Sequence, residues 1–212
     1  MYSVLVAASS MAGTMLTRVE SGPIAPPGTY QVRLIVDRTL VATEHFALKK
    51  DPRANATQAD LAAQFAFLKQ IRDRTTQAND AVKAIRWVKT QLTDREKKLT
   101  GQALDEFRPM AATLRSELSV VEDSIYQTKN RSGQDPLNYP IRLNNKIAAL
   151  MSVVSSSDSA PTSQANMVEE DLATQVNVQL KKLGQILSSD LTAFNALVHE
   201  QNIPAVVPKT AK

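Results

Sequence analysis

The stretch that decides the fold is residues 127–150, which read QTKNRSGQDPLNYPIRLNNKIAAL. Within it, Gly133, Pro136 and Pro140 prevent a helix from continuing, and Pro140 biases Tyr139 toward an extended backbone. Long runs with helical apolar periodicity lie on both sides of this stretch. It is therefore predicted to contain a loop that separates amphipathic helices.

Two long helices are expected before this loop. The first starts near Thr57, which together with Asp60 resembles a capping box. Its apolar residues recur at steps of three and four and form one face about nine turns long: Leu61, Phe65, Leu68, Ile71, Thr75, Ala78, Val82, Ile85, Val88 and Leu92. The second helix is expected from about residue 102 to residue 128. Its apolar period of about 3.5 predicts a coiled-coil-like seam, and Pro109 should either kink the helix or mark its true start.

Two further helices are expected after the loop. A short helix carries Ile141, Leu143, Ile147, Leu150 and Met151. Asn144 and Asn145 are poor interior helix residues, so their amides are expected to bond the neighbouring loop backbone. The last helix is capped by Thr162, runs for about 40 residues to about residue 201, and ends before two prolines. Its expected apolar stripe is Val168, Leu172, Val176, Leu180, Leu183, Leu187, Leu191, Phe194 and Val198.

A β-hairpin is expected before the first helix. Tyr30, Val32, Leu34 and Val36 alternate with other residues, as in a strand with one buried face. Asp37 and Arg38 make a plausible turn, so the predicted strands are residues 29–36 and 40–49. Two strands cannot bury a face by themselves. The hairpin must therefore pack on the helices, on a strand from residues 1–20, or on something outside this chain.

These patterns predict a mainly α fold. We expect an antiparallel bundle of three long helices plus one short helix, preceded by the small β-hairpin. The expected division is an irregular start with the hairpin in residues 1–53, the helical bundle in residues 54–203, and a disordered tail in residues 204–212.

Composition excludes several functional classes. Of the 212 residues, 25 are basic and 21 acidic, and the charges are interspersed. A nucleic-acid surface would need a clustered basic face with aromatic residues, and none is visible. No run of apolar residues is long enough to span a membrane as a helix. The absence of cysteine excludes disulfides and Cys-based zinc sites. The first residues lack the basic region of a signal peptide.

No catalytic constellation or cofactor motif is visible. His45 and His199 are isolated in the sequence, so neither a metal site nor any other cofactor is expected. Glu169, Glu170 and Asp171 are expected to complement the dipole of the last helix near its start. Trp87, the single tryptophan, is expected at the edge of a helix interface.

One concentration of polar residues supports a binding hypothesis. Its members are Tyr126, Lys129, Asn130, Arg131, Asp135, Asn138, Tyr139, Arg142, Asn144 and Asn145. They could form a pocket for a glycan, a peptide or an anion. The alternative is a loop tucked against the bundle, in which these side chains satisfy buried backbone groups. Arg131 and Asp135 could form a local ion pair that fixes the loop.

Three motifs in the sequence carry a resemblance to a known family. They are PPGTYQVRL at 26–34, KKDPR at 49–53 and IYQTKNRSGQDPLNYPIRLNNKIAAL at 125–150. Together they resemble the C-terminal region of large bacterial exported proteins, which are sortilin-like or Asp-box-repeat β-propellers described as glycosyl hydrolases. The resemblance implies that the hairpin is the end of an Ig-like domain and that the helices form the tail. It also implies a periplasmic or secreted location. The propeller, with any catalytic carboxylates, would lie outside this chain.

The leading hypothesis is therefore a non-catalytic structural or interaction module from an exported propeller-type protein. Its expected partner is the missing propeller or another protein. The alternatives are a carbohydrate- or peptide-binding module that uses the polar cluster, and an accessory region of a glycoside hydrolase. The seam of the second helix also suggests a homo-oligomer.

Overall fold

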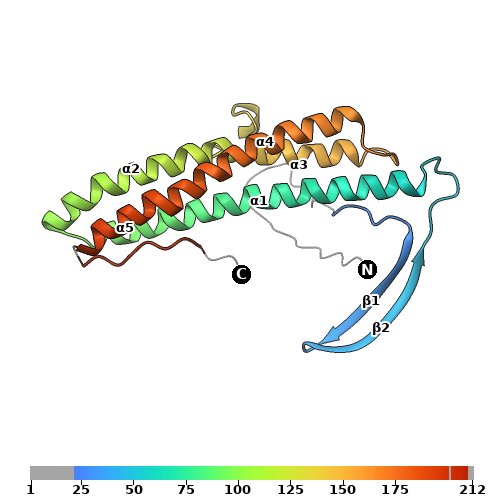
Figure 1. The fold of residues 1–212 in the computed structure, drawn as a ribbon, viewed down its shortest axis with the longest axis horizontal. Helices are drawn as coiled ribbons and strands as arrows, with labels where there is room; N and C mark the ends of the chain where they lie inside the picture. The colour runs from blue at the N-terminus through green and yellow to red at the C-terminus, as the bar shows by residue number, and fades with distance from the viewer. Residues whose placement is uncertain (1–21, 201, 210–212) are drawn as a thin grey trace.

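The structure is a computed structural model that describes residues 22–200 and 202–209. It is a mainly helical molecule with a two-stranded antiparallel hairpin at one end (Figure 1). The predicted fold class is confirmed. The elements in chain order are β1 (Gly28–Val36), β2 (Thr39–Leu48), α1 (Gln58–Glu96), α2 (Gly101–Ile125), the 3-10 turn η1 (Asp135–Leu137), α3 (Leu143–Val154), α4 (Ser163–Gln185), the π-helical turn η2 (Ile186–Asp190) and α5 (Leu191–Glu200).

Helix α1, with 39 residues, extends along the whole length of the bundle (Figure 1). The predicted capping box is present at its start. The Thr57 hydroxyl accepts a hydrogen bond from the Asp60 amide at 3.1 Å, and the Asp60 carboxylate accepts one from the Thr57 amide at 2.8 Å. These bonds satisfy backbone donors that have no partner inside the helix.

Helices α2 and α3 follow one another along the bundle and run in the same direction (Figure 1). With 25 and 12 residues, they together nearly match the 39 residues of α1. Residues 126–142 form the predicted loop between them. Pro109 lies inside α2, so the expectation that it could mark the start of this helix is wrong.

The last helix is interrupted by a π-helical turn. Thr162 caps α4 as predicted, because its hydroxyl accepts a hydrogen bond from the Ala165 amide at 3.1 Å. The buried residues Ile186 and Leu191 are five positions apart, a spacing that an α-helix with 3.6 residues per turn would place on different faces. The wider turn η2 lies between them and keeps both side chains in the core.

The bundle has two hydrophobic clusters. The first lies among the second half of α1, α2 and α5, where the Phe107 and Phe194 rings meet edge to face with centroids 5.5 Å apart. The second lies among the first half of α1, α3 and α4 and is centred on Ile71 and Ile147. Leu180 of α4 contacts both clusters. The seam predicted on α2 is buried in the first cluster, so the chain itself occupies the surface proposed for a second copy.

The expected start of the stripe on α4 is wrong by one position. Val168 is exposed, whereas Glu169 is buried and its carboxylate lies 3.6 Å from Nε of Arg74 on α1. Glu169 is thus an interhelical partner rather than a charge that complements the helix dipole. A second buried carboxylate, Glu122 on α2, accepts hydrogen bonds of 2.7 Å from both Arg86 and Lys89.

The chain after α5 turns back along the bundle (Figure 1). Asn202 has a φ of +59°, the Ile203 amide bonds the Val198 carbonyl, and the Asn202 amide bonds the His199 carbonyl, which is a Schellman motif. Ile203 and Val206 are buried. The tail was expected to be disordered; in the structure its residues 204–207 are bonded to α1 and α5, and residues 210–212 lie outside the described part of the chain.

Candidate functional site

The polar cluster of the sequence surrounds the loop between α2 and α3. Asp135 organises this loop from the start of η1. Its carboxylate accepts hydrogen bonds from the backbone amides of Arg131 and Ser132 and from the Ser132 hydroxyl. These bonds hold the pKa of Asp135 below its ordinary value of 3.8. Arg131 thus contributes its backbone amide, and the ion pair expected for its side chain is not among the salt bridges of the described residues.

Gln127, which is not a member of the predicted cluster, closes the same loop. Its side chain is buried, donates to the Pro140 carbonyl at 2.7 Å and accepts from the Lys129 amide at 3.2 Å. The bridge joins the two ends of the loop. Nothing in the local sequence separates Gln127 from an exposed glutamine, because its partner is thirteen residues away.

The two tyrosines of the cluster are each covered by a cation of the chain. The Arg86 guanidinium lies 4.6 Å from the centre of the Tyr126 ring, and the Lys129 ammonium lies 5.7 Å from that of Tyr139. Such cation–π contacts stabilise the rings where they are. They also occupy faces on which a sugar would stack, so these contacts favour the structural interpretation of the loop.

The two asparagines at the start of α3 differ from expectation. The Asn144 amide donates to the side-chain oxygen of Asn79 on α1 at 3.3 Å, and its own oxygen accepts from the Asn145 amide at 2.8 Å. The expected bond from Asn144 to loop backbone is therefore wrong. Asn144 is buried and joins two helices, whereas Asn145 is only half-buried.

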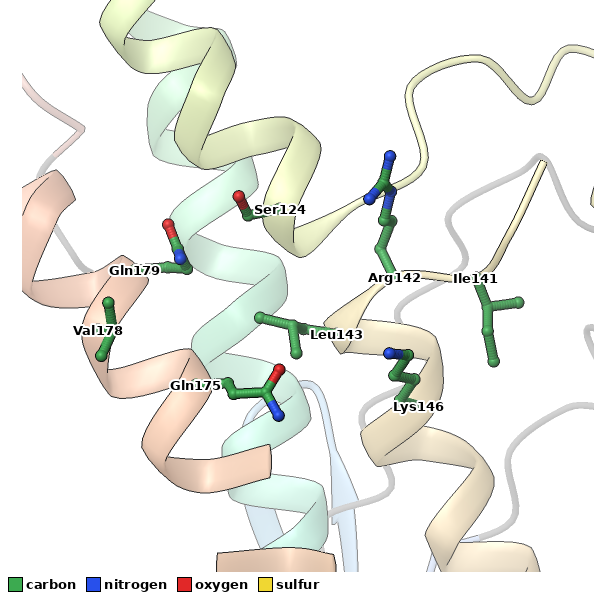
Figure 2. Close-up of a pocket in the computed structure, with 8 residues that line it drawn as sticks. All are labelled: Ser124, Ile141, Arg142, Leu143, Lys146, Gln175, Val178 and Gln179. Carbon is green, nitrogen blue, oxygen red and sulfur yellow. The ribbon is translucent and has the colours of Figure 1, made fainter. Parts of the chain in front are cut away.

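A cavity of about 350 Å³ lies between the end of α2, the start of α3 and the middle of α4 (Figure 2). Of the predicted site residues, Arg142 lines it, together with Lys146, Gln175 and Gln179. The buried Nε of Arg142 and Oε1 of Gln179 have no hydrogen-bond partner. Figure 2 shows the Arg142 guanidinium beside the loop rather than over Gln175 or Gln179.

Two other members of the cluster do not converge on this cavity. The side-chain oxygen of Asn130 is buried without a hydrogen-bond partner, but Asn130 is not a lining residue. Asn138 is exposed at the end of η1. The predicted residues thus form a loop with internal bonds and one neighbouring hollow, not a single pocket.

Metal and membrane sites are also not found among the described residues. Within residues 22–200 and 202–209, no three His, Cys, Asp or Glu side chains lie together in a way that could hold a metal ion. Over the same residues, no helix is both long and apolar enough to cross a membrane.

The hairpin presents a different kind of surface. Asp37 and Arg38 both have positive φ, of 48° and 66°, as in the type I′ turns that join two-residue hairpins. In the antiparallel register Tyr30 pairs with Phe46 and Val32 with Glu44. The strands are irregular between Leu34 and Ile35, where β2 contains an extra residue.

One face of this hairpin is mostly apolar and exposed. Because side chains alternate across a strand, seven apolar residues share this face with Glu44, which pairs with Val32: Tyr30, Val32, Leu34, Val36, Ala42, Phe46 and Leu48. Val32 is 57% exposed and Phe46 is 51% exposed. The hairpin projects from the end of the bundle (Figure 1), and within the described residues neither strand contacts a helix. We define these seven residues as the hairpin face.

No protein family, curated protein or solved structure was found to match this chain. The similarity of residues 125–150 to exported propeller proteins therefore remains a prediction.

Proposed function

We propose that this chain is a non-catalytic structural and interaction module. In this proposal the helical bundle is a rigid support, and the hairpin face docks on a β-sheet of a partner. The observation that supports it is the exposure of the hairpin face. Within residues 22–200 and 202–209, the hairpin displays a half-buried strand pattern that no layer covers, and the strand expected from residues 1–20 lies outside these described residues.

The physical argument concerns the missing layer. Two strands alone are marginally stable in water, because they cannot bury an apolar face. Burial stabilises by about 25 cal/mol for each Å² of apolar surface, so a layer over Val32, Leu34 and Phe46 would contribute several kcal/mol. Sheets that pack face to face lie about 10 Å apart and interdigitate such side chains.

We propose that the partner is the rest of an Ig-like β domain in an exported propeller-type protein. The resemblance of residues 26–34 and 49–53 supports this choice, because the first range includes most of β1 and the second directly follows β2. The same proposal places the protein in the periplasm or outside the cell.

The test is hydrogen exchange of the β1 and β2 amides in two samples. One is the purified 212-residue chain, and the other is the mature polypeptide isolated from its native cells and identified by intact mass. We expect fast exchange of the strands in the chain alone and slow exchange in the native polypeptide. Equally fast exchange in both samples would refute the proposal.

Substitutions on the two faces of the hairpin supply the matched control. Val32→Thr and Phe46→Thr should remove the protection of the native polypeptide, while the β-branched residues keep strand propensity. Gln31→Thr and His45→Thr change a pair on the opposite face and should leave protection unchanged. Equal effects of the two double variants would mean that the hairpin face is not the docking surface.

A second candidate function is binding of a carbohydrate or peptide beside the 126–145 cluster. It is favoured by the unpartnered Nε of Arg142 and Oε1 of Gln179 at the 350 Å³ cavity. Arg142 and Lys146 both line the cavity, so a ligand with a carboxylate, such as an acidic sugar, fits its charge. A panel of acidic and neutral glycans tests this function, with binding expected for acidic ones and lost in Arg142→Gln. Binding that persists in this variant would refute it.

A further inference from the structure

The C-terminal segment 203–207 lies against α1 and α5, near the end of α1 opposite to the hairpin (Figure 1). We call the surface of the two helices that contacts this segment the groove. The segment belongs to neither a helix nor a strand. Three side chains of the two helices hold its backbone: Gln91 and Arg95 from α1, and Asn195 from α5.

The two amides hold the segment in the way that a neighbouring strand would. Asn195 accepts from the Val206 amide at 2.7 Å and donates to the Val206 carbonyl at 2.8 Å. Gln91 accepts from the Val207 amide at 3.1 Å and donates to the Val207 carbonyl at 2.7 Å. A carboxamide can make such a pair of bonds because it carries both a donor and an acceptor. This contact recognises an extended backbone whatever its side chains are.

Arg95 extends the backbone contact toward the start of the segment. Its guanidinium donates to the carbonyl oxygens of Pro204 and Ala205, and a third nitrogen is bonded to the Gln91 carbonyl of its own helix at 3.1 Å. The bond within α1 orients the guanidinium. Four consecutive residues of the segment are thus bonded through their backbones.

Two side-chain positions give the groove its sequence preference. Ile203 is buried and Val206 is 0% exposed, whereas Pro204, Ala205 and Val207 are exposed. The buried positions are three apart, which is the repeat of a polyproline II helix, and Pro204 favours that conformation. Backbone bonds that give affinity and pockets that give specificity are the two parts of a peptide-recognition site.

We propose that this groove is a peptide-binding site for extended segments with an apolar residue, a proline and a second apolar residue at positions one, two and four. Residues 203–207 are its intramolecular ligand. The Schellman motif ends α5 at Asn202 and Ile203, so residues 204–207 can leave the groove without unwinding this helix. The site is separate from the hairpin face, and its proof or failure leaves the proposed function untouched.

The test uses the full chain with a tail that cannot enter the groove. A carboxylate at a fully buried apolar position is strongly disfavoured, so Val206→Asp should release the tail. The probe is the peptide NIPAVVPK, which has the sequence of residues 202–209 and carries an N-terminal fluorescein, with fluorescence anisotropy as the readout. Trp87 is one helical turn from Gln91 and supplies a second signal. We expect saturable binding to the Val206→Asp chain and at least about tenfold weaker binding to the unmodified chain, whose own tail competes at high effective concentration.

Control variants are made in the Val206→Asp chain. Gln91→Ala together with Asn195→Ala should weaken peptide binding at least about tenfold, since both backbone clamps are lost. Gln70→Ala removes an exposed amide elsewhere on α1 and should have no effect. A folded Val206→Asp chain that does not bind the peptide would overturn the proposal.

Hydrogen exchange of the unmodified chain keeps the proposal testable if Val206→Asp does not fold. We expect the amides of Val206 and Val207 to exchange by local opening, at least about a hundredfold faster than the core amide of Val88. Exchange of all three amides at the same rate would show that the tail opens only with the whole bundle. The segment would then be a fixed part of the core and not an exchangeable ligand.

Discussion

Glu122 offers a direct test of how α1 and α2 are held together. Its buried carboxylate accepts hydrogen bonds of 2.7 Å from Arg86 and from Lys89. Glu122→Gln removes the charge, keeps the shape and leaves both cations without an anion. A hydrogen bond to a charged group contributes about 1.5–3 kcal/mol to stability. The side chains of Arg86 and Lys89 are 44% and 24% exposed, so water can replace part of the loss.

We therefore expect Glu122→Gln to lower the free energy of unfolding by about 2 kcal/mol. For a chain of this size, such a loss lowers Tm by about 4–8 °C. Urea denaturation and heating, both followed by far-UV circular dichroism, measure the two quantities. Glu117→Gln changes an exposed residue of the same helix and should shift stability by no more than about 0.5 kcal/mol.

A double-mutant cycle with Lys89→Met measures the coupling across the interface. We expect a coupling free energy of about 1 kcal/mol, because Glu122 and Lys89 are in direct contact. If Glu122→Gln proves no more destabilising than Glu117→Gln, the inference that this carboxylate joins the two helices is refuted.

Four further predictions concern other parts of the molecule. Phe107→Ala should cost about 3–5 kcal/mol in urea denaturation, because the ring is fully buried; a loss below about 1 kcal/mol would contradict this packing. Thr57→Ala should cost about 1 kcal/mol and accelerate amide exchange in the first turn of α1, and unchanged exchange would contradict the cap. Asn144→Ala should cost about 1–2 kcal/mol, whereas unchanged melting would argue against a structural role. The pKa of Asp135 is lowered by the amides of Arg131 and Ser132, so its stabilisation is present above the unfolded pKa and is lost as pH falls through the folded one. NMR should thus show the loop released only at a pH below the ordinary carboxyl pKa of 3.8, and Asp135→Asn should abolish this transition; a transition that persists would assign it to another group.

The parts of the fold that depend on local chemistry could be predicted from the sequence. Thr57 and Thr162 cap their helices, because each hydroxyl accepts a hydrogen bond from the backbone amide three residues later. Asp37 and Arg38 form the expected turn between strands whose alternation is visible in the sequence. The apolar face of α1 is buried from Leu68 to Leu92 in nearly the expected pattern.

The parts that failed depend on partners far away in the chain. Val168 is the more apolar residue, yet Glu169 faces α1, where Arg74 supplies a cation that no local pattern reveals. The tail was expected to fray as a chain end, but the side chain of Gln91, which is 116 residues away, accepts a hydrogen bond from the Val207 amide.

The same limit explains the outcome for the candidate site. The sequence located the loop between α2 and α3 and its polar composition. It could not show that the Asp135 carboxylate accepts hydrogen bonds from backbone amides, or that the Asn144 side chain donates a hydrogen bond to Asn79 on α1. Hydrogen-bonding side chains have many possible partners, and only the folded chain selects among them.

The division of the core into two clusters has a consequence for how the molecule comes apart. Leu180 is the one residue that contacts both clusters among those assigned to them in the described chain. Cooperative unfolding requires that the loss of one set of contacts weakens the other. In this bundle the two clusters are linked by the backbones of α1 and α4, which run through both, and by the contacts of Leu180. The α3 half, with the smaller cluster, is expected to behave as a foldon that melts first, while α2 and α5 stay closed around Phe107. A force applied to the hairpin would act first on the α3 half, because α1 begins there. The bundle is therefore expected to unfold under force in two steps, the α3 half before the half around Phe107.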